Sequence, residues 1–185
     1  RPPPKGPAVR AAREGDLLRV TLARPEKRNA FSSEMRDGLV EALRIALCDP
    51  GIREVVLDGE GPAFCSGGDL DEFGTLPDPA TAHLVRTTRS AARLLAATAG
   101  RVRAEVHGAC VGAGVELPAF AARVVARADA TFWLPELALG LVPGAGGTVS
   151  LPRRIGRQRT AWLALSGRPI DAPTALAWGL VDELR

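Results

Sequence analysis

Two acidic residues stand alone in apolar stretches of this 185-residue chain. Glu116 follows a glycine-rich turn in VHGACVGAGVELPAFAA, and Glu136 lies in FWLPELALGLVPGAGG. Burial among apolar neighbours raises the pKa of a glutamate from about 4.3 towards neutrality, so one such group can hold a proton while the other accepts one. This pair predicts an acid–base site. The alternatives are a helix N-terminal acid for Glu116 and a solvated loop acid for Glu136.

Two glycine-rich turns each follow a predicted strand, at residues 66–69 and 112–114. Such turns can leave backbone N–H groups unpaired, and two N–H groups that converge on one point form an oxyanion hole. Beside two glutamates, that arrangement would stabilise an enolate, such as a thioester supplies, while protons move at adjacent carbons. The other interpretation is that these glycines only permit tight turns and close helix packing.

Other kinds of site find little support in the sequence. The glycines at residues 143–148 lack the lysine of a phosphate-binding P-loop, and GACVGAG does not fit the dinucleotide spacing. Ser66 lacks the preceding glycine of a hydrolase elbow, and His83 and His107 are better explained as structural or surface residues. The three cysteines show no paired spacing, so neither a disulfide framework nor a metal site is expected.

Composition favours a single α/β domain in a reducing compartment, which we take to be the cytoplasm. Hydrophobic residues make up 46% of the chain and charged residues 24%, which suits a sizeable core. A net charge of +3 is too small to predict nucleic-acid binding. The longest nearly uncharged run, residues 130–152, is broken by proline, glycine and Glu136, so no membrane span is expected, and nothing resembles a signal peptide.

The coarse pattern alternates strands with helices. The Pro-rich opening predicts a flexible arm over residues 1–14, followed by one core domain over residues 15–185. Strands are expected at 17–23, 53–59, 102–108 and 123–133, and helices at 32–49, 77–100, after 112, and at 147–155, 157–165 and 172–177.

Several details of these elements follow from residue type and spacing. Ser32 or Ser33 is expected to cap the first helix, and Asp171 the last. The first helix should bury one stripe, formed by Met35, Leu39, Leu43 and Leu47. The continuous apolar centre of residues 53–59 favours a sheet covered on both faces.

Five segments together resemble the enoyl-CoA hydratase/isomerase family, the crotonase superfamily, over nearly all of residues 15–183. They are RPEKRNAFS, GEGPAFCSGGDLDEF, VHGACVGAGVEL, WLPELALGLVPGAGGTVSLPRRIG and GLVDE, in the family's order and approximate spacing. The resemblance implies an α/β fold built as a spiral of ββα units. It further implies homotrimers or dimers of trimers.

The resemblance also assigns roles to residues. The backbone amides of Gly68 and Ala113 match the oxyanion hole, while Glu116 matches a water-activating base and Glu136 the proton donor to C2. The positions implied to bind the CoA thioester substrate are Ala63, Ser66, Gly68, Asp69, Leu70 and Gly112.

Some positions depart from the family pattern. Ala113 replaces a usual glycine, which would disfavour a positive φ there. Pro118 falls just inside the helix that carries Glu116 and could displace that glutamate. The family normally continues for several tens of residues beyond GLVDE, so we expect the C-terminal helical region to be missing from this chain.

These features predict an enoyl-CoA hydratase that adds water reversibly to a trans-2-enoyl-CoA, with neither metal nor redox cofactor. Double-bond isomerisation, which can use one glutamate, and thioester hydrolysis are alternatives within the family. A catalytically weak member that acts as a binding subunit is a further alternative, suggested by Pro118, the arginine excess and the short C-terminus. The sequence does not determine acyl chain length.

Overall fold

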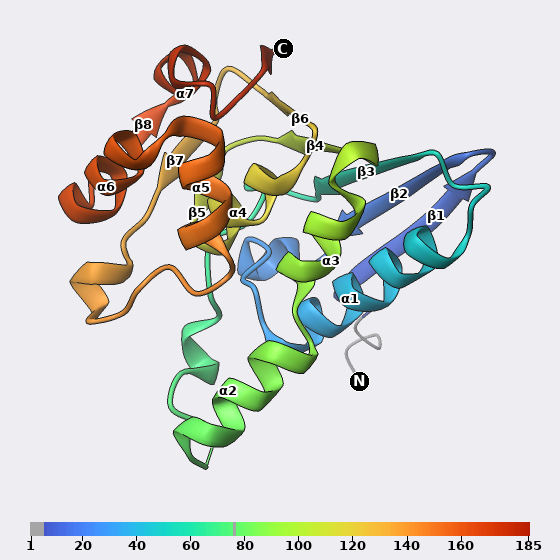
Figure 1. Cartoon of the computed structure of the whole chain (residues 1–185), viewed down its shortest axis with the longest axis horizontal. Helices are drawn as coiled ribbons and strands as arrows, with labels where there is room; N and C mark the ends of the chain where they lie inside the picture. Colours follow the sequence, from blue (N-terminus) through green and yellow to red (C-terminus); the bar gives the residue numbers. More distant parts are fainter. Residues whose placement is uncertain (1–5, 76) are drawn as a thin grey trace.

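The computed structural model describes residues 6–75 and 77–185, which build two sheets with helices packed around them (Figure 1). The larger sheet has the strand order β1-β2-β3-β4-β6-β9, in which only the β1–β2 pair is antiparallel. The smaller sheet has the order β5-β7-β8. The strands are β1 (Val9–Glu14), β2 (Leu17–Leu22), β3 (Glu54–Gly59), β4 (Val102–Val106), β5 (Ala109–Val111), β6 (Arg123–Ala126), β7 (Thr131–Trp133), β8 (Ile170–Asp171) and β9 (Glu183–Leu184).

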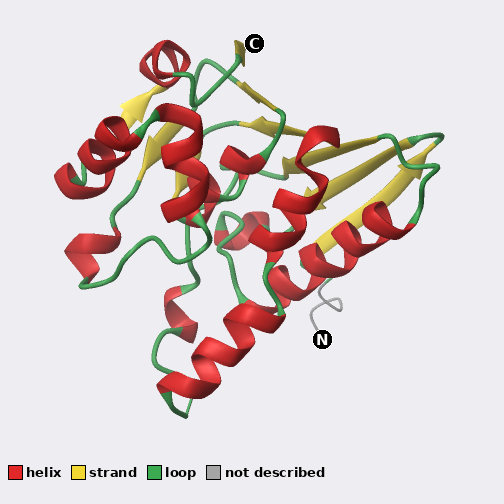
Figure 2. Ribbon diagram, in the orientation of Figure 1, coloured by secondary structure: helices red, strands yellow, loops and turns green. Residues whose placement is uncertain are grey.

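The helices are interspersed among the strands along the chain, and Figure 2 shows them packed around the sheets. They are α1 (Ser33–Cys48), α2 (Pro79–Thr88), α3 (Ala91–Thr98), α4 (Ala113–Glu116), α5 (Gly147–Ile155), α6 (Arg157–Ser166) and α7 (Ala172–Trp178). Short 3₁₀ turns join them, among them Pro118–Phe120 and Glu136–Leu139. In the part of the chain that the structure describes, no helix is long and apolar enough to cross a membrane.

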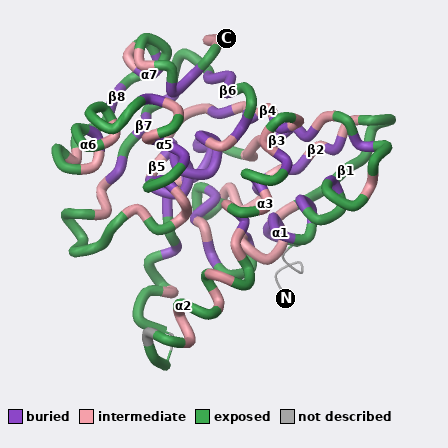
Figure 3. Tube along the Cα trace, in the orientation of Figure 1, coloured by how far each residue is buried: buried purple, intermediate pink, exposed green. Residues whose placement is uncertain are grey.

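One part of the core lies between the larger sheet and the α1–α3 pair, and another surrounds the smaller sheet, where buried residues of α4 and α5 pack. Figure 3 shows buried positions in both regions. Strand β2 alternates half-buried and buried positions, so every second side chain enters the core. Ser32 caps α1 by accepting a hydrogen bond from the Met35 N–H, as expected. The predicted stripe is confirmed for Met35, Leu39 and Leu43 but is wrong for Leu47, which is 45% exposed at the end of the helix.

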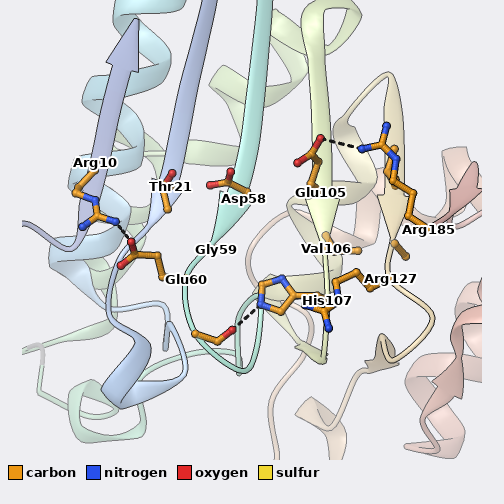
Figure 4. A pocket seen from close by; sticks show the side chains of 13 residues that line it. Arg10, Thr21, Asp58, Gly59, Glu60, Glu105, Val106, His107, Arg127 and Arg185 are labelled. Atoms are coloured by element: carbon orange, nitrogen blue, oxygen red, sulfur yellow. Dashed lines mark hydrogen bonds and ion pairs between the residues drawn. The ribbon is translucent and has the colours of Figure 1, made fainter. Parts of the chain in front are cut away.

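The opposite face of the larger sheet is polar, so the expectation of cover on both faces is wrong (Figure 4). Arg103 pairs with Glu54 at 2.8 Å across neighbouring strands, and Arg185 pairs with Glu105 at 3.6 Å. A hollow of about 520 Å³ lies among such charged residues. Val56 in the centre of β3 is nevertheless buried, between Arg19 and Arg103 on the adjacent strands. Long arginine stems can cover an apolar residue while their charges stay in water, which explains the apolar centre without a covering helix.

Three expected segments differ from the observed ones. The flexible arm over residues 1–14 is wrong for residues 9–14, which form β1 and pair along β2; residues 1–5 lie outside the described residues. The single helix over residues 77–100 is two helices, because Ser90 caps a new one at α3. Residues 123–133 form β6 and β7, which belong to different sheets. The remaining helices follow the expected ranges closely, and Asp171 caps α7.

Candidate active site

The two glycine-rich turns lie side by side at the end of a short parallel pairing. Cys65 and Cys110 form a parallel bridge, with the Val111 N–H donating to the Cys65 carbonyl at 2.9 Å. Gly68 and Ala113 each follow this bridge by three residues, so equal lengths of chain bring both to the same cavity of about 760 Å³. Neither backbone N–H donates to a backbone carbonyl among the described residues. Both amides are therefore available to a ligand in this cavity.

The backbone around Ala113 suits alanine. The positive φ falls on the preceding residue, Gly112, at 50°, whereas Ala113 begins α4 with a negative φ. The strain that an alanine would suffer at positive φ therefore does not arise.

Glu116 ends α4 and points into the cavity although its side chain is only 1% exposed. Its Oε2 accepts hydrogen bonds from the N–H groups of Ala145 at 2.8 Å and Gly147 at 2.7 Å. The Ser150 hydroxyl donates to the Glu116 carbonyl at 2.8 Å. Pro118 does shorten the helix, since the chain continues as a 3₁₀ turn at Pro118–Phe120, yet these bonds hold Glu116 in the cavity.

Glu136 begins a 3₁₀ turn on the opposite side of Gly112 and is half-buried. A Cβ on Gly112 would lie 2.5 Å from the Glu136 Oε1, so only glycine leaves room for this carboxyl. The Glu136 Oε2 is buried without a hydrogen-bond partner among the described residues. Ionising a buried carboxyl group that has an oxygen without a hydrogen-bond donor costs free energy. The arrangement therefore favours a protonated carboxyl group, or one whose free oxygen accepts a hydrogen bond from a ligand.

The two glutamates have raised pKa values. Burial raises the pKa of Glu116 to about 7, and the nearby Glu136 adds to this, while the Gly147 and Ala145 amides and the Arg86 cation oppose it. Burial also raises the pKa of Glu136. Two carboxyl groups with raised pKa values in one cavity can exchange protons with a substrate.

The cavity brings together only part of the predicted substrate-binding set. Gly68 and Asp69 line it with Ala113, Glu116 and Glu136. The other four lie just outside its wall: Ala63 is buried, Ser66 donates to the Lys27 carbonyl, Leu70 is 65% exposed, and Gly112 lies under Glu136.

The residues that hold Glu116 were missed by sequence reasoning. Ala145 and Gly147 lie in PGAGG, which was considered as a phosphate loop and as part of a family motif but not as a support for Glu116. Gly147 has a spatial reason to be glycine, because a Cβ there would lie 2.6 Å from the Glu116 Cγ. The cluster of small residues after Glu136 was therefore the sequence signal that this segment packs closely against another part of the chain.

Fold and site together define a protein with two backbone amides and two carboxyl groups at one cavity. The sequence profile of the enoyl-CoA hydratase/isomerase family matches residues 12–185, and the chain belongs to that family. Its α/β architecture is the crotonase fold expected from the motifs.

Relatives with different activities are similarly close. The chain is 38% identical to a 2,3-dehydroadipyl-CoA hydratase of Escherichia coli, over 94% of this chain and 67% of the relative. It is 37% identical to a 1,2-epoxyphenylacetyl-CoA isomerase of the same organism, over 92% of this chain and 67% of that relative. This chain thus spans about two thirds of the length of both proteins.

Solved structures agree with this assignment. An enoyl-CoA hydratase from Thermoplasma volcanium superposes with a TM-score of 0.86 at 34% identity, covering 97% of this chain and 72% of that one. A Thermobifida fusca protein solved in complex with CoA gives a TM-score of 0.85 at 32% identity, with the same two coverages.

Proposed function

We propose that this chain carries the active site of an enoyl-CoA hydratase, which adds water reversibly across the C2=C3 bond of a trans-2-enoyl-CoA. The observation that carries the proposal is the pair Glu116 and Glu136 in one cavity with the free amides of Gly68 and Ala113. A second carboxyl beside the first gives hydration both the base and the acid it needs.

In the proposed reaction the Gly68 and Ala113 N–H groups donate to the thioester oxygen. Glu116 takes a proton from water as the water oxygen forms a bond to C3, and the C2=C3 π electrons move into an enolate held at the two amides. Glu136 then donates its proton to C2. Glu116 is left protonated and Glu136 ionised, and exchange with solvent restores both groups. No step uses a metal or a redox cofactor.

Glu116 suits the base role because its Oε2 is already an acceptor for two amides, which fixes the carboxyl and leaves Oε1 to face the substrate. Glu136 suits the acid role because its buried, unpartnered Oε2 favours the protonated form.

Isomerisation is the second candidate, since relatives named hydratase and isomerase match this chain almost equally well. An isomerase moves one proton between C2 and C4 and can use a single carboxyl. The two activities therefore differ in how many glutamates they require.

The test follows the ultraviolet absorbance of short trans-2-enoyl-CoA and 3-enoyl-CoA substrates with wild type, Glu116→Gln and Glu136→Gln. We expect hydration in wild type and a loss of about 10²- to 10⁴-fold in each variant. The matched control is Glu41→Gln, at an exposed position of α1 where Glu41 pairs with Arg44, and it should keep full activity. Conversion of the 3-enoyl-CoA into the conjugated 2-enoyl-CoA, without any hydration, would make the protein an isomerase. Release of free CoA would make it a thioester hydrolase.

We also propose that the protein assembles as a homotrimer or a dimer of trimers and acts in the cytoplasm. Size-exclusion chromatography with light scattering measures the assembly. Binding of enoyl-CoA without turnover of any substrate would favour the binding-subunit alternative.

A further inference from the structure

Eight charged side chains line the active-site cavity, and most already have partners. They are Arg36, Asp69, Glu72, Asp78, Arg86, Arg89, Glu116 and Glu136. Arg36 and Arg89 each bind Asp37, both at 3.0 Å. Of the three arginines in this wall, only Arg86 has no ion pair or side-chain hydrogen bond with any residue that the structure describes. Arg86 is therefore a cation in the cavity wall that could pair with an anionic group of a ligand.

Arg86 lines the same cavity as the oxyanion amides. It belongs to α2, which projects beyond the two sheets and forms one wall (Figure 1). Its Cζ lies 3.9 Å from the position that a Cβ on Gly144 would take. Gly144 precedes Ala145, whose N–H holds Glu116. The guanidinium therefore stands at the loop that positions the catalytic base, and its field opposes the rise in the pKa of Glu116.

The rest of this end of the cavity is apolar. Ala82 and Val85 of α2 face it together with Leu141 and Val142. A thioester oxygen at Gly68 and Ala113 places C2 and C3 near the glutamates. The remaining acyl carbons would then have these apolar residues and Arg86 in the same cavity wall.

We propose that the cavity accepts acyl-CoA substrates whose acyl group ends in a carboxylate, and that Arg86 binds this carboxylate. The inference rests on the proposed function, because it takes the acyl group to run from the oxyanion amides past the glutamates. A guanidinium presents two parallel N–H donors that match a carboxylate, whereas a methyl end gains nothing from them. Because Arg86 is exposed when no ligand is bound, the gain in binding affinity from this ion pair is modest.

The test measures binding of saturated thioesters, which cannot be hydrated, by titration calorimetry. Matched pairs are succinyl- and butyryl-CoA, glutaryl- and pentanoyl-CoA, and adipyl- and hexanoyl-CoA. We expect wild type to bind the carboxylated member about five- to tenfold more tightly for at least one pair. Arg86→Gln should abolish that preference without weakening the uncharged member. Arg93→Gln is the control, because it changes an exposed arginine of α3 that does not line the cavity. This variant should keep the preference for the carboxylated thioester.

Two results overturn the inference: no pair shows the preference in wild type, or Arg86→Gln weakens both members equally. Equal weakening would mean that Arg86 supports the cavity wall or the charge of Glu116. Because no turnover is involved, a retained preference in a protein that hydrates no enoyl-CoA would sink the hydratase proposal instead.

Discussion

At the scale of single residues, the two glutamates differ because their neighbours differ. Glu116 gives one oxygen to two backbone amides, so a proton on this group belongs on Oε1. Glu136 has a buried oxygen with no donor among the described residues. Identical side chains can thus take opposite roles in proton transfer, because amide donors favour the charged form and burial favours the neutral form.

The raised pKa of Glu116 predicts how stability depends on pH. An unfolded glutamate ionises near pH 4.5, but the folded one resists ionisation until about pH 7, so the unfolded state binds fewer protons in this window. Relative to pH 4.5, wild type should lose about 3 kcal/mol of unfolding free energy by pH 8 through this group. Glu116→Gln, which cannot ionise, should lack that loss.

Urea unfolding of both proteins between pH 4.5 and 8 measures the difference. The gap between Glu116→Gln and wild type should widen as pH rises and level off above about pH 7. A gap that is constant with pH would mean that the pKa of Glu116 is not raised.

At the scale of elements, the site depends on how closely α5 approaches α4. Helix α4 is only four residues long, so the amides that hold Glu116 come from the start of α5 and the loop before it. No side chain separates Gly147 from Glu116. The spacing of these two elements therefore determines where the carboxylate lies.

Gly147→Ala tests this spacing. Alanine favours a helix by about 1 kcal/mol over glycine, yet the new methyl would lie 2.6 Å from the Glu116 Cγ. We expect net destabilisation of about 1–3 kcal/mol and at least about tenfold lower hydratase activity, since a 1 Å displacement can cost more than that. Thermal unfolding and the enoyl-CoA assay measure the two effects.

Gly100→Ala is the matched control, because nothing lies within 4 Å of a Cβ there and its φ is not positive. It should change neither property. If Gly147→Ala behaves in the same way, α5 can move away without affecting Glu116.

At the scale of the whole molecule, Arg154 joins the helical segments to the larger sheet. Its guanidinium donates to the buried carbonyls of Leu180 and Ala121, each at 2.8 Å, and pairs with Asp182. Asp182 in turn accepts from the Val124 N–H at 2.7 Å. One side chain thus connects α5, the turn after α4, and the segment that leads into β9.

Arg154→Met should therefore destabilise the fold by about 2–4 kcal/mol, since two buried carbonyl oxygens lose their donors. Arg153→Met is the matched control, because Arg153 is exposed and has no side-chain bond to any part of the chain that the structure describes. Chemical denaturation should place Arg153→Met within about 0.5 kcal/mol of wild type. Equal effects of the two substitutions would contradict the connecting role.

Sequence reasoning succeeded where the signal was local. The start of α1 was predicted because a serine cap and a stripe of apolar residues are read within a few turns. It missed the break before α3 and the pairing of β1 with β2, although the Ser90 cap and the short hairpin are both local. It also failed for Leu47, whose exposure depends on which elements pack beside the end of α1. The cover of the second sheet face was wrong for a related reason, since arginine stems on neighbouring strands hide Val56.

The sequence by itself determined the family and singled out the two glutamates, because both depend on residue types at fixed spacing within short motifs. Only the tertiary structure decided how Glu116 is held, since Ala145 and Gly147 lie about thirty positions further along the chain. It likewise decided that Arg86 faces the cavity without a partner among the residues that the structure describes, because the pairing of a charge depends on which elements fold beside it.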